Sequence, residues 1–323
     1  MDGLNDTQRY FVEEHIEDFR DGLIGRRELI RRVAIVVGSA AVATTLLAAC
    51  DLSPRSTATT SPTQIASPSQ PLVAQPFATP PPAATTDGIT VKETDPRITV
   101  SRPEIKGTDG ISLMAYVAKP IASGRVPGVM VIHENRGQTE HIRDVVRRAA
   151  TAGFLAVNID LTARQGGGEK LGDAVTGAIG NLTLSQKLDD HTAALAYLAA
   201  NSSGAVGAVG FCFGGGEVWN LLAAGADLKA AVPFYGPQPS NYQDIGTKNK
   251  AATLAVYAEQ DTRITSTGPQ MEEQLKRSGV PEQIMVFPGV NHAFHNDTGA
   301  RYAPDAAQKA WVATIEWFRK YLA

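Results

Sequence analysis

The sequence predicts an α/β protein with a mostly parallel, doubly wound sheet, helices on both faces, and an antiparallel hairpin at its start. Two observations support this fold class. From residue 128 onward, short apolar runs alternate with amphipathic stretches of helical period, which is typical of successive β–α units. Upstream, Gly107 and Gly110 separate two strand-like segments, which indicates a hairpin.

The expected strands are short apolar runs, and the expected helices lie between them. The hairpin strands are expected at 98–105 and 111–118, and the later strands at 128–132, 155–159, 205–211, 230–234, 254–257 and 283–287. The helices are expected at 140–152, 185–200, 217–224, 269–278 and 303–322. In the second of these helices Leu188, Leu195 and Leu198 share one face, as packing on a sheet requires. We expect His191 at the surface or as a cap, and Trp219 in the core.

Cys212 follows the predicted strand 205–211 directly and precedes a helical stretch. Its neighbours Gly210 and Gly214 give the pattern G-x-C-x-G, a form of the nucleophile elbow on which the α/β-hydrolase fold places its nucleophile. The start of the following helix favours a thiolate and, later in the reaction, an oxyanion. A lone cysteine is more often an inert core residue. The glycine spacing and the preceding strand favour the nucleophile here.

Two partners for Cys212 follow in the chain order of such a triad, nucleophile, acid and histidine. Asp261 comes at the end of the expected strand 254–257, and His292 comes in the loop after the last expected strand. In these roles His292 moves the proton and Asp261 holds the imidazole in one tautomer. Glu259 and His295 are the alternative acid and base. Taken alone, Asp261 could equally be a helix N-cap.

The loop 133–137 follows the buried strand 128–132. In this fold such a loop donates one backbone N–H to the oxyanion, and the residue after the nucleophile donates the other. We therefore assign the oxyanion hole to the N–H groups of Asn135 and Phe213.

Four segments together resemble the dienelactone hydrolase family. They are His133-Glu134-Asn135-Arg136-Gly137, Gly210-Phe211-Cys212-Phe213-Gly214-Gly215, Asp261 and Asn291-His292-Ala293-Phe294. The resemblance covers roughly residues 96–323 and includes the segment 160–165. It implies a Cys-His-Asp triad, a glutamate at position 134 that hydrogen-bonds the resting thiol, a small ester or lactone as substrate, and no cofactor.

The sequence departs from this family where the substrate carboxylate is bound. Asn296 stands four residues after the histidine, where dienelactone-cleaving members carry an arginine. A bidentate carboxylate clamp needs arginine geometry, so neutral short esters are the expected substrates. Arg136 and Arg164 could supply a substitute cation or could be surface residues. Tyr235 follows a strand near the cleft; it is a core or a substrate-binding residue.

The first 49 residues have the features of an export signal and are expected to lie outside the catalytic fold. A basic segment at 25–32 contains arginine pairs and precedes an apolar run at 33–49, which suggests the twin-arginine route. The run ends in Leu-Ala-Ala-Cys, so Cys50 is the expected lipidation site. The enzyme would then be anchored to the outer face of the bacterial cytoplasmic membrane. An uncleaved membrane helix is the alternative, and the acidic, helical stretch 1–22 has no assigned role.

Residues 50–95 are expected to form a disordered tether, because their Ser, Thr and Pro content gives no hydrophobic period. The catalytic domain is then 96–323. The net charge of −3 comes without a basic patch, which argues against nucleic acid, and two cysteines exclude a disulfide framework. No zinc-ligand spacing is present, so no metal is expected. A thiol redox protein and a non-catalytic binding module remain as alternatives, and the sequence indicates no oligomeric state.

Overall fold

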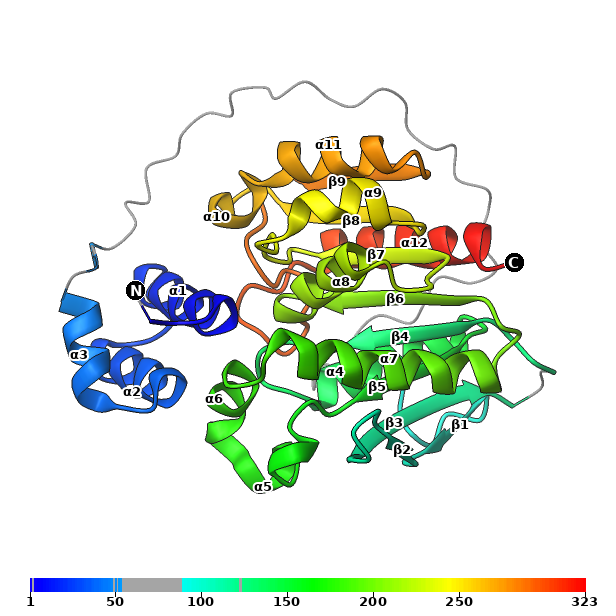
Figure 1. Cartoon of the computed structure of the whole chain (residues 1–323), viewed down its shortest axis with the longest axis horizontal. Helices are drawn as coiled ribbons and strands as arrows, with labels where there is room; N and C mark the ends of the chain where they lie inside the picture. Colours follow the sequence, from blue (N-terminus) through cyan, green and yellow to red (C-terminus); the bar gives the residue numbers. More distant parts are fainter. Residues whose placement is uncertain (2, 49, 51, 54–88, 122–123) are drawn as a thin grey trace.

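The computed structural model describes residues 1, 3–48, 50, 52–53, 89–121 and 124–323, which contain a nine-stranded mixed sheet (Figure 1). The strand order is β1-β3-β5-β4-β6-β7-β8-β9, and β2 also pairs with β3. The strands are β1 Ile98–Ser101, β2 Glu104–Lys106, β3 Ser112–Pro120, β4 Gly128–Ile132, β5 Leu155–Ile159, β6 Val206–Phe211, β7 Ala230–Phe234, β8 Ala252–Ala258 and β9 Glu282–Phe287. The strands β5, β4 and β6 to β9 are parallel, so the predicted mostly parallel sheet is confirmed.

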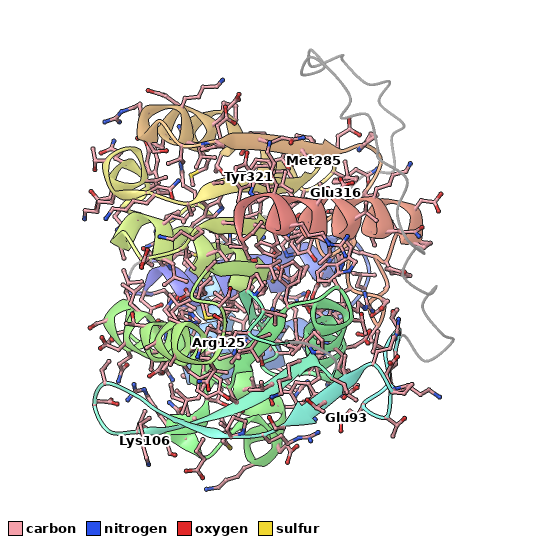
Figure 2. The ribbon with its side chains drawn as sticks, turned by 90° about the vertical axis from the view of Figure 1, so that its right-hand side faces the viewer. Glu93, Lys106, Arg125, Met285, Glu316 and Tyr321 are labelled. Carbon is pink, nitrogen blue, oxygen red and sulfur yellow. The ribbon has the colours of Figure 1, made fainter. Side chains whose placement is uncertain are left out.

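Helices lie on both faces of this sheet, as the alternation of β and α segments requires (Figure 1). The main helices of the catalytic domain are α4 Glu140–Thr151, α7 Leu184–Asn201, α8 Phe213–Ala224, α11 Gly268–Ser278 and α12 Pro304–Tyr321. Shorter α-helices are α5 Gly168–Leu171, α6 Val175–Gly180, α9 Ile245–Lys248 and α10 Thr262–Thr265. Figure 2 views the molecule from the side opposite to its N-terminal helices, with β2 and Lys106 at the bottom and β9 and Met285 at the top.

The predicted hairpin is present, but its first strand is divided. Both β1 and β2 pair with β3 in antiparallel register, for example Val100 with Ala118 and Ile105 with Leu113. Pro103 separates them, because proline has no N–H to give to the ladder. The predicted strand 98–105 is therefore two short strands.

The centre of the sheet is apolar on both faces, as parallel strands covered by helices must be. Every residue of β4, β5, β6, β7 and β8 is buried. Trp219 lies in this core, as expected. The prediction for His191 was wrong: the ring is fully buried, and its Nε2 lies 3.5 Å from Glu217, which also accepts a hydrogen bond from Lys187.

The first helices pack against the catalytic domain, which corrects the expectation that they lie outside the fold. They are α1 Asp6–Arg20, α2 Arg26–Val37 and α3 Ala40–Ala48. A capping box between Asn5 and Gln8 starts α1, and Gly38 ends α2 in the left-handed region at φ 75°. The side chains of Phe11 and Leu29 are fully buried. The hydrophobic residues of this segment therefore belong to the common core.

The apolar run 33–49 does not form one long helix. Among the described residues no single helix is long and apolar enough to cross a membrane. Together α2 and α3 reach the required length and composition, but they are bent by 116° at their junction. Most of the predicted tether, residues 54–88, lies outside the described residues, and the export signal stays a prediction.

Candidate active site

Cys212 occupies a sharp turn between β6 and α8. Its backbone is at φ 57° and ψ −122°, a conformation that L-residues rarely adopt outside functional sites. The flanking glycines permit this turn. A Cβ on Gly210 would lie 2.1 Å from the carbonyl oxygen of Gly214, and one on Gly214 would lie 2.4 Å from that of Ile132. These close contacts explain why glycine occupies both positions in the G-x-C-x-G pattern.

The close backbone packing at the elbow leads to a stability prediction. Gly210→Ala should lower the free energy of unfolding by about 3 kcal/mol or more, because backbone atoms must move to admit the methyl group. Gly124→Ala is the matched control, since a Cβ there meets nothing within 4 Å. Urea denaturation of both variants gives the comparison. Equal stability of the two variants would contradict the packing described here.

His292 and Asp261 meet beside Cys212. The imidazole Nδ1 lies 2.6 Å from Asp261 Oδ2, and both residues are buried. This contact excludes the two alternatives as members of the pair. The exposed Glu259 instead accepts a hydrogen bond from the Gly289 N–H at 2.8 Å. His295 stacks on Phe211 in the core.

Three titratable groups at this point influence one another. Burial would lower the pKa of His292, but the charges of Glu14 and Asp261 outweigh it and hold that pKa well above its ordinary value. Burial would raise the pKa of Asp261, yet His292 lowers it. Burial and the charge of Glu14 raise the pKa of the Cys212 thiol. The arrangement therefore favours a protonated imidazole beside a neutral thiol.

Glu134 follows β4 and is buried near the thiol. Its carboxylate accepts a hydrogen bond from the Asn296 amide at 2.6 Å. Burial raises the pKa of Glu134, and its charge contributes to the raised pKa of Cys212. The carboxylate that accepts from the Cys212 thiol in this structure is that of Glu14, at 3.9 Å. Asn296 is thus occupied as the partner of Glu134.

The two assigned oxyanion donors lie on the expected elements. Phe213 is the first residue of α8, and Asn135 lies in the loop after β4. The Asn135 carbonyl accepts a hydrogen bond from Thr176 at 3.1 Å, which links this loop to α6.

The N-terminal helix α1 brings two further side chains to the nucleophile. The Tyr10 hydroxyl lies 3.2 Å from Cys212 Sγ and 3.4 Å from His292 Nε2. Glu14 Oε2 lies 3.3 Å from the same Nε2, and its Oε1 accepts a hydrogen bond from Arg263. Under this cover Cys212 is 4% and His292 5% exposed. Tyr10 and Glu14 therefore cover the thiol on the side of α1.

The sequence analysis did not predict that Tyr10, Glu14 and Arg263 belong to the site. Arg263 carried a usable signal, since it stands two residues after the predicted acid in a loop at the sheet edge. Tyr10 and Glu14 carried no such signal. Nothing in the local pattern of the acidic segment 1–22 indicates that they contact Cys212, which lies 202 and 198 residues further along the chain.

The other candidate substrate-binding residues lie in different places. Tyr235 is buried with its ring centroid 4.9 Å from that of His292, so it forms a wall of the site. Arg164 is held by Asp109 and Asp190. Arg136 is exposed and lines a separate cavity of about 270 Å³.

Among the described residues, one group has three side chains of metal-ligand type. It consists of Glu14, Cys212 and His292, whose ligand atoms lie within 4.8 Å of one another. A cation placed among them would face the guanidinium of Arg263, which already binds Glu14. This repulsion disfavours a metal, and we assign none.

Comparison with known proteins decides the family. Residues 113–322 match the model of the dienelactone hydrolase family. The chain belongs to the dienelactone hydrolase family. A Salmonella typhi protein provisionally named a carboxymethylenebutenolidase is 34% identical over 229 residues, which are 66% of this chain and 85% of that protein. A Bradyrhizobium protein provisionally named a 2-oxo-3-(5-oxofuran-2-ylidene)propanoate lactonase is 31% identical, over 67% of this chain and 92% of that protein.

A solved structure from Klebsiella pneumoniae, described provisionally as a dienelactone hydrolase, has a TM-score of 0.63 and 30% identity. It matches 69% of this chain and 99% of its own chain. These findings confirm the predicted α/β-hydrolase fold and the class of enzyme, a hydrolase of esters or lactones.

Proposed function

We propose that this hydrolase cleaves small esters or lactones through an acyl-cysteine intermediate. The Cys212 thiol gives its proton to His292 Nε2 and attacks the substrate carbonyl, and the N–H groups of Asn135 and Phe213 stabilise the oxyanion. The tetrahedral adduct expels the alcohol, which takes the proton from His292. Water, deprotonated by His292, then attacks the thioester; the adduct expels the Cys212 thiolate, which takes the proton back from His292, and the acid is released. The observation that carries this proposal is the 2.6 Å contact between Asp261 and His292 beside a cysteine on a strained elbow.

Glu134 is proposed to hold the resting thiol once α1 has left. Its negative charge disfavours the thiolate and would keep Cys212 as SH until substrate arrives. Burial and the charge of Glu14 are the larger causes of the raised pKa of Cys212, and the charge of Glu134 raises it further. This contribution is consistent with the proposed role of Glu134.

Small esters without a carboxylate are the proposed substrates. The amide of Asn296 is committed to Glu134, and Arg164 to two aspartates, so neither offers a free carboxylate clamp. A panel of short esters and lactones with and without a carboxylate tests the substrate class. Two assays of the same protein, ester hydrolysis and peroxide consumption, distinguish a hydrolase from a thiol redox protein. A non-catalytic binding module would show neither activity.

We further propose that the protein is exported and anchored through Cys50. The sequence features that support this are the basic segment 25–32, the apolar run after it, and the cysteine that ends the run. Processing at Cys50 would make this residue the new N-terminus and the site of lipid attachment.

The anchoring proposal predicts the behaviour of one variant. Cys50→Ala should remain unprocessed or be released without acyl chains, because the lipidated thiol is gone, and its partitioning into detergent should fall. Intact mass spectrometry of protein from the native host, with and without the substitution, measures this. A wild-type mass equal to that of the full, unmodified chain would refute the assignment.

A further inference from the structure

The contact between α1 and the active site is built from specific pairs at both ends of the helix. At the site, the guanidinium of Arg263 donates to Glu14, lies 3.7 Å from Glu13, and is 4.9 Å from the Tyr10 ring centroid. All of these partners are on α1. At the far end Arg301 donates to Asp18 at 2.8 Å and to Asp21 at 2.7 Å.

Apolar packing joins the same surfaces. Phe11 is fully buried, and its ring lies edge-on to that of Phe213, the first residue of α8, at 5.4 Å. The backbone of α2 approaches α6 so closely that a Cβ on Gly177 would lie 2.4 Å from the Ile35 carbonyl oxygen. The N-terminal helices are thus fitted to a seat around the catalytic cysteine.

The groups placed by α1 block the chemistry as well as the entrance. His292 Nε2 must accept the thiol proton, but it lies against Glu14 at 3.3 Å, a contact that favours an imidazole already carrying a proton. The Tyr10 hydroxyl contacts both Sγ, at 3.2 Å, and Nε2, at 3.4 Å. While α1 stays docked, Tyr10 and Glu14 both contact the pair of groups that must exchange a proton, Cys212 Sγ and His292 Nε2.

We propose that residues 6–37 are a built-in inhibitor of the hydrolase, which masks Cys212 until the N-terminal segment is displaced or removed. The inhibitor precedes Cys50, so the processing proposed above would remove it from the mature enzyme. It is also additional to the hydrolase unit: 69% of this chain accounts for 99% of the Klebsiella structure, and the family match begins at residue 113. The proposal rests on the proposed function only in taking Cys212 as the nucleophile.

The test measures how fast iodoacetamide alkylates Cys212 in the full chain, a reaction that needs access to the thiol but no turnover. Peptide mass spectrometry distinguishes Cys212 from Cys50. Phe11→Asp should displace α1, because a carboxylate would have to be buried against Phe213. Gly177→Leu should displace the N-terminal helices from the side of α6, because its side chain would collide with the backbone of α2 at Ile35. Gly180→Ala is the control, since its Cβ would meet Gln8 and Phe11 at 3.4 Å or more, in ordinary contact.

Both opening variants should be alkylated about tenfold or more faster than wild type, because the masked thiol reacts only when the helix opens. Both should also hydrolyse p-nitrophenyl acetate faster, and Gly180→Ala should match wild type. Equal alkylation of wild type and Phe11→Asp would overturn the proposal. So would faster alkylation with a loss of wild-type ester turnover, since α1 would then be part of the working site. If the opening variants are alkylated faster but neither they nor wild type hydrolyse the ester, the masking of Cys212 by residues 6–37 would be supported and the proposed hydrolase function rejected.

Discussion

Cys212→Ala should abolish ester hydrolysis, with a fall in kcat of about 10³-fold or more, as expected when a covalent nucleophile is removed. The reason is that no other described side chain on the elbow can form the acyl intermediate; Phe213 and the glycines around it carry no nucleophile. Hydrolysis of p-nitrophenyl acetate should be followed in wild type and in the Gly177→Leu background, where α1 is expected to be displaced.

Cys212→Ser is the matched variant for this measurement, because it keeps the shape of the side chain and replaces sulfur with the smaller, less acidic and less nucleophilic oxygen. It should retain at most weak activity, since the groups around position 212 are arranged for sulfur. Full activity of Cys212→Ala would show that another residue performs the attack.

Asp261→Asn should lower kcat by about 10⁴-fold, the effect of an amide that holds a triad histidine in the wrong tautomer. The 2.6 Å contact with Nδ1 requires an acceptor, and an asparagine amide can present a donor there instead. Binding of substrate should change little, so the loss should appear in kcat rather than in KM.

Glu259→Gln provides the control for Asp261→Asn. It makes the same chemical change two residues away, on an exposed side chain whose described partner is the Gly289 N–H. Its kcat should stay near that of wild type. A larger loss in Glu259→Gln than in Asp261→Asn would reassign the acid.

Much of the fold was predictable because local pattern and tertiary environment agree. The strands β4, β5 and β7 coincide with the predicted ranges, since they are buried runs bounded by turn residues. The helix after Cys212 begins at Phe213, four residues earlier than predicted. The glycines 214–216 have a low helix propensity, which hid the start of this helix in the sequence. They are present because neighbouring atoms lie too close to leave room for larger side chains. The predicted strand 98–105 is divided at Pro103, because the prediction used the apolar pattern and did not take account of the proline.

The candidate site was predictable to the extent that its residues lie at strand ends. Cys212, Asp261 and His292 follow β6, β8 and β9, and the parallel sheet brings these ends together. The contribution of α1 was not predictable. Glu14 and Tyr10 reach the thiol through a packing of N-terminal helices on the catalytic domain, and no local rule relates the two parts of the chain.

The central claim, an acyl-cysteine on residue 212, can be observed directly. We would mix Gly177→Leu and wild type with p-nitrophenyl acetate, quench in acid within one turnover, and locate the acetyl group by peptide mass spectrometry. The account predicts an acetyl group on the Cys212 peptide that hydroxylamine removes, more of it in Gly177→Leu than in wild type, and none on that peptide in Cys212→Ala. An acetyl group on another residue, with turnover that persists in Cys212→Ala, would contradict it.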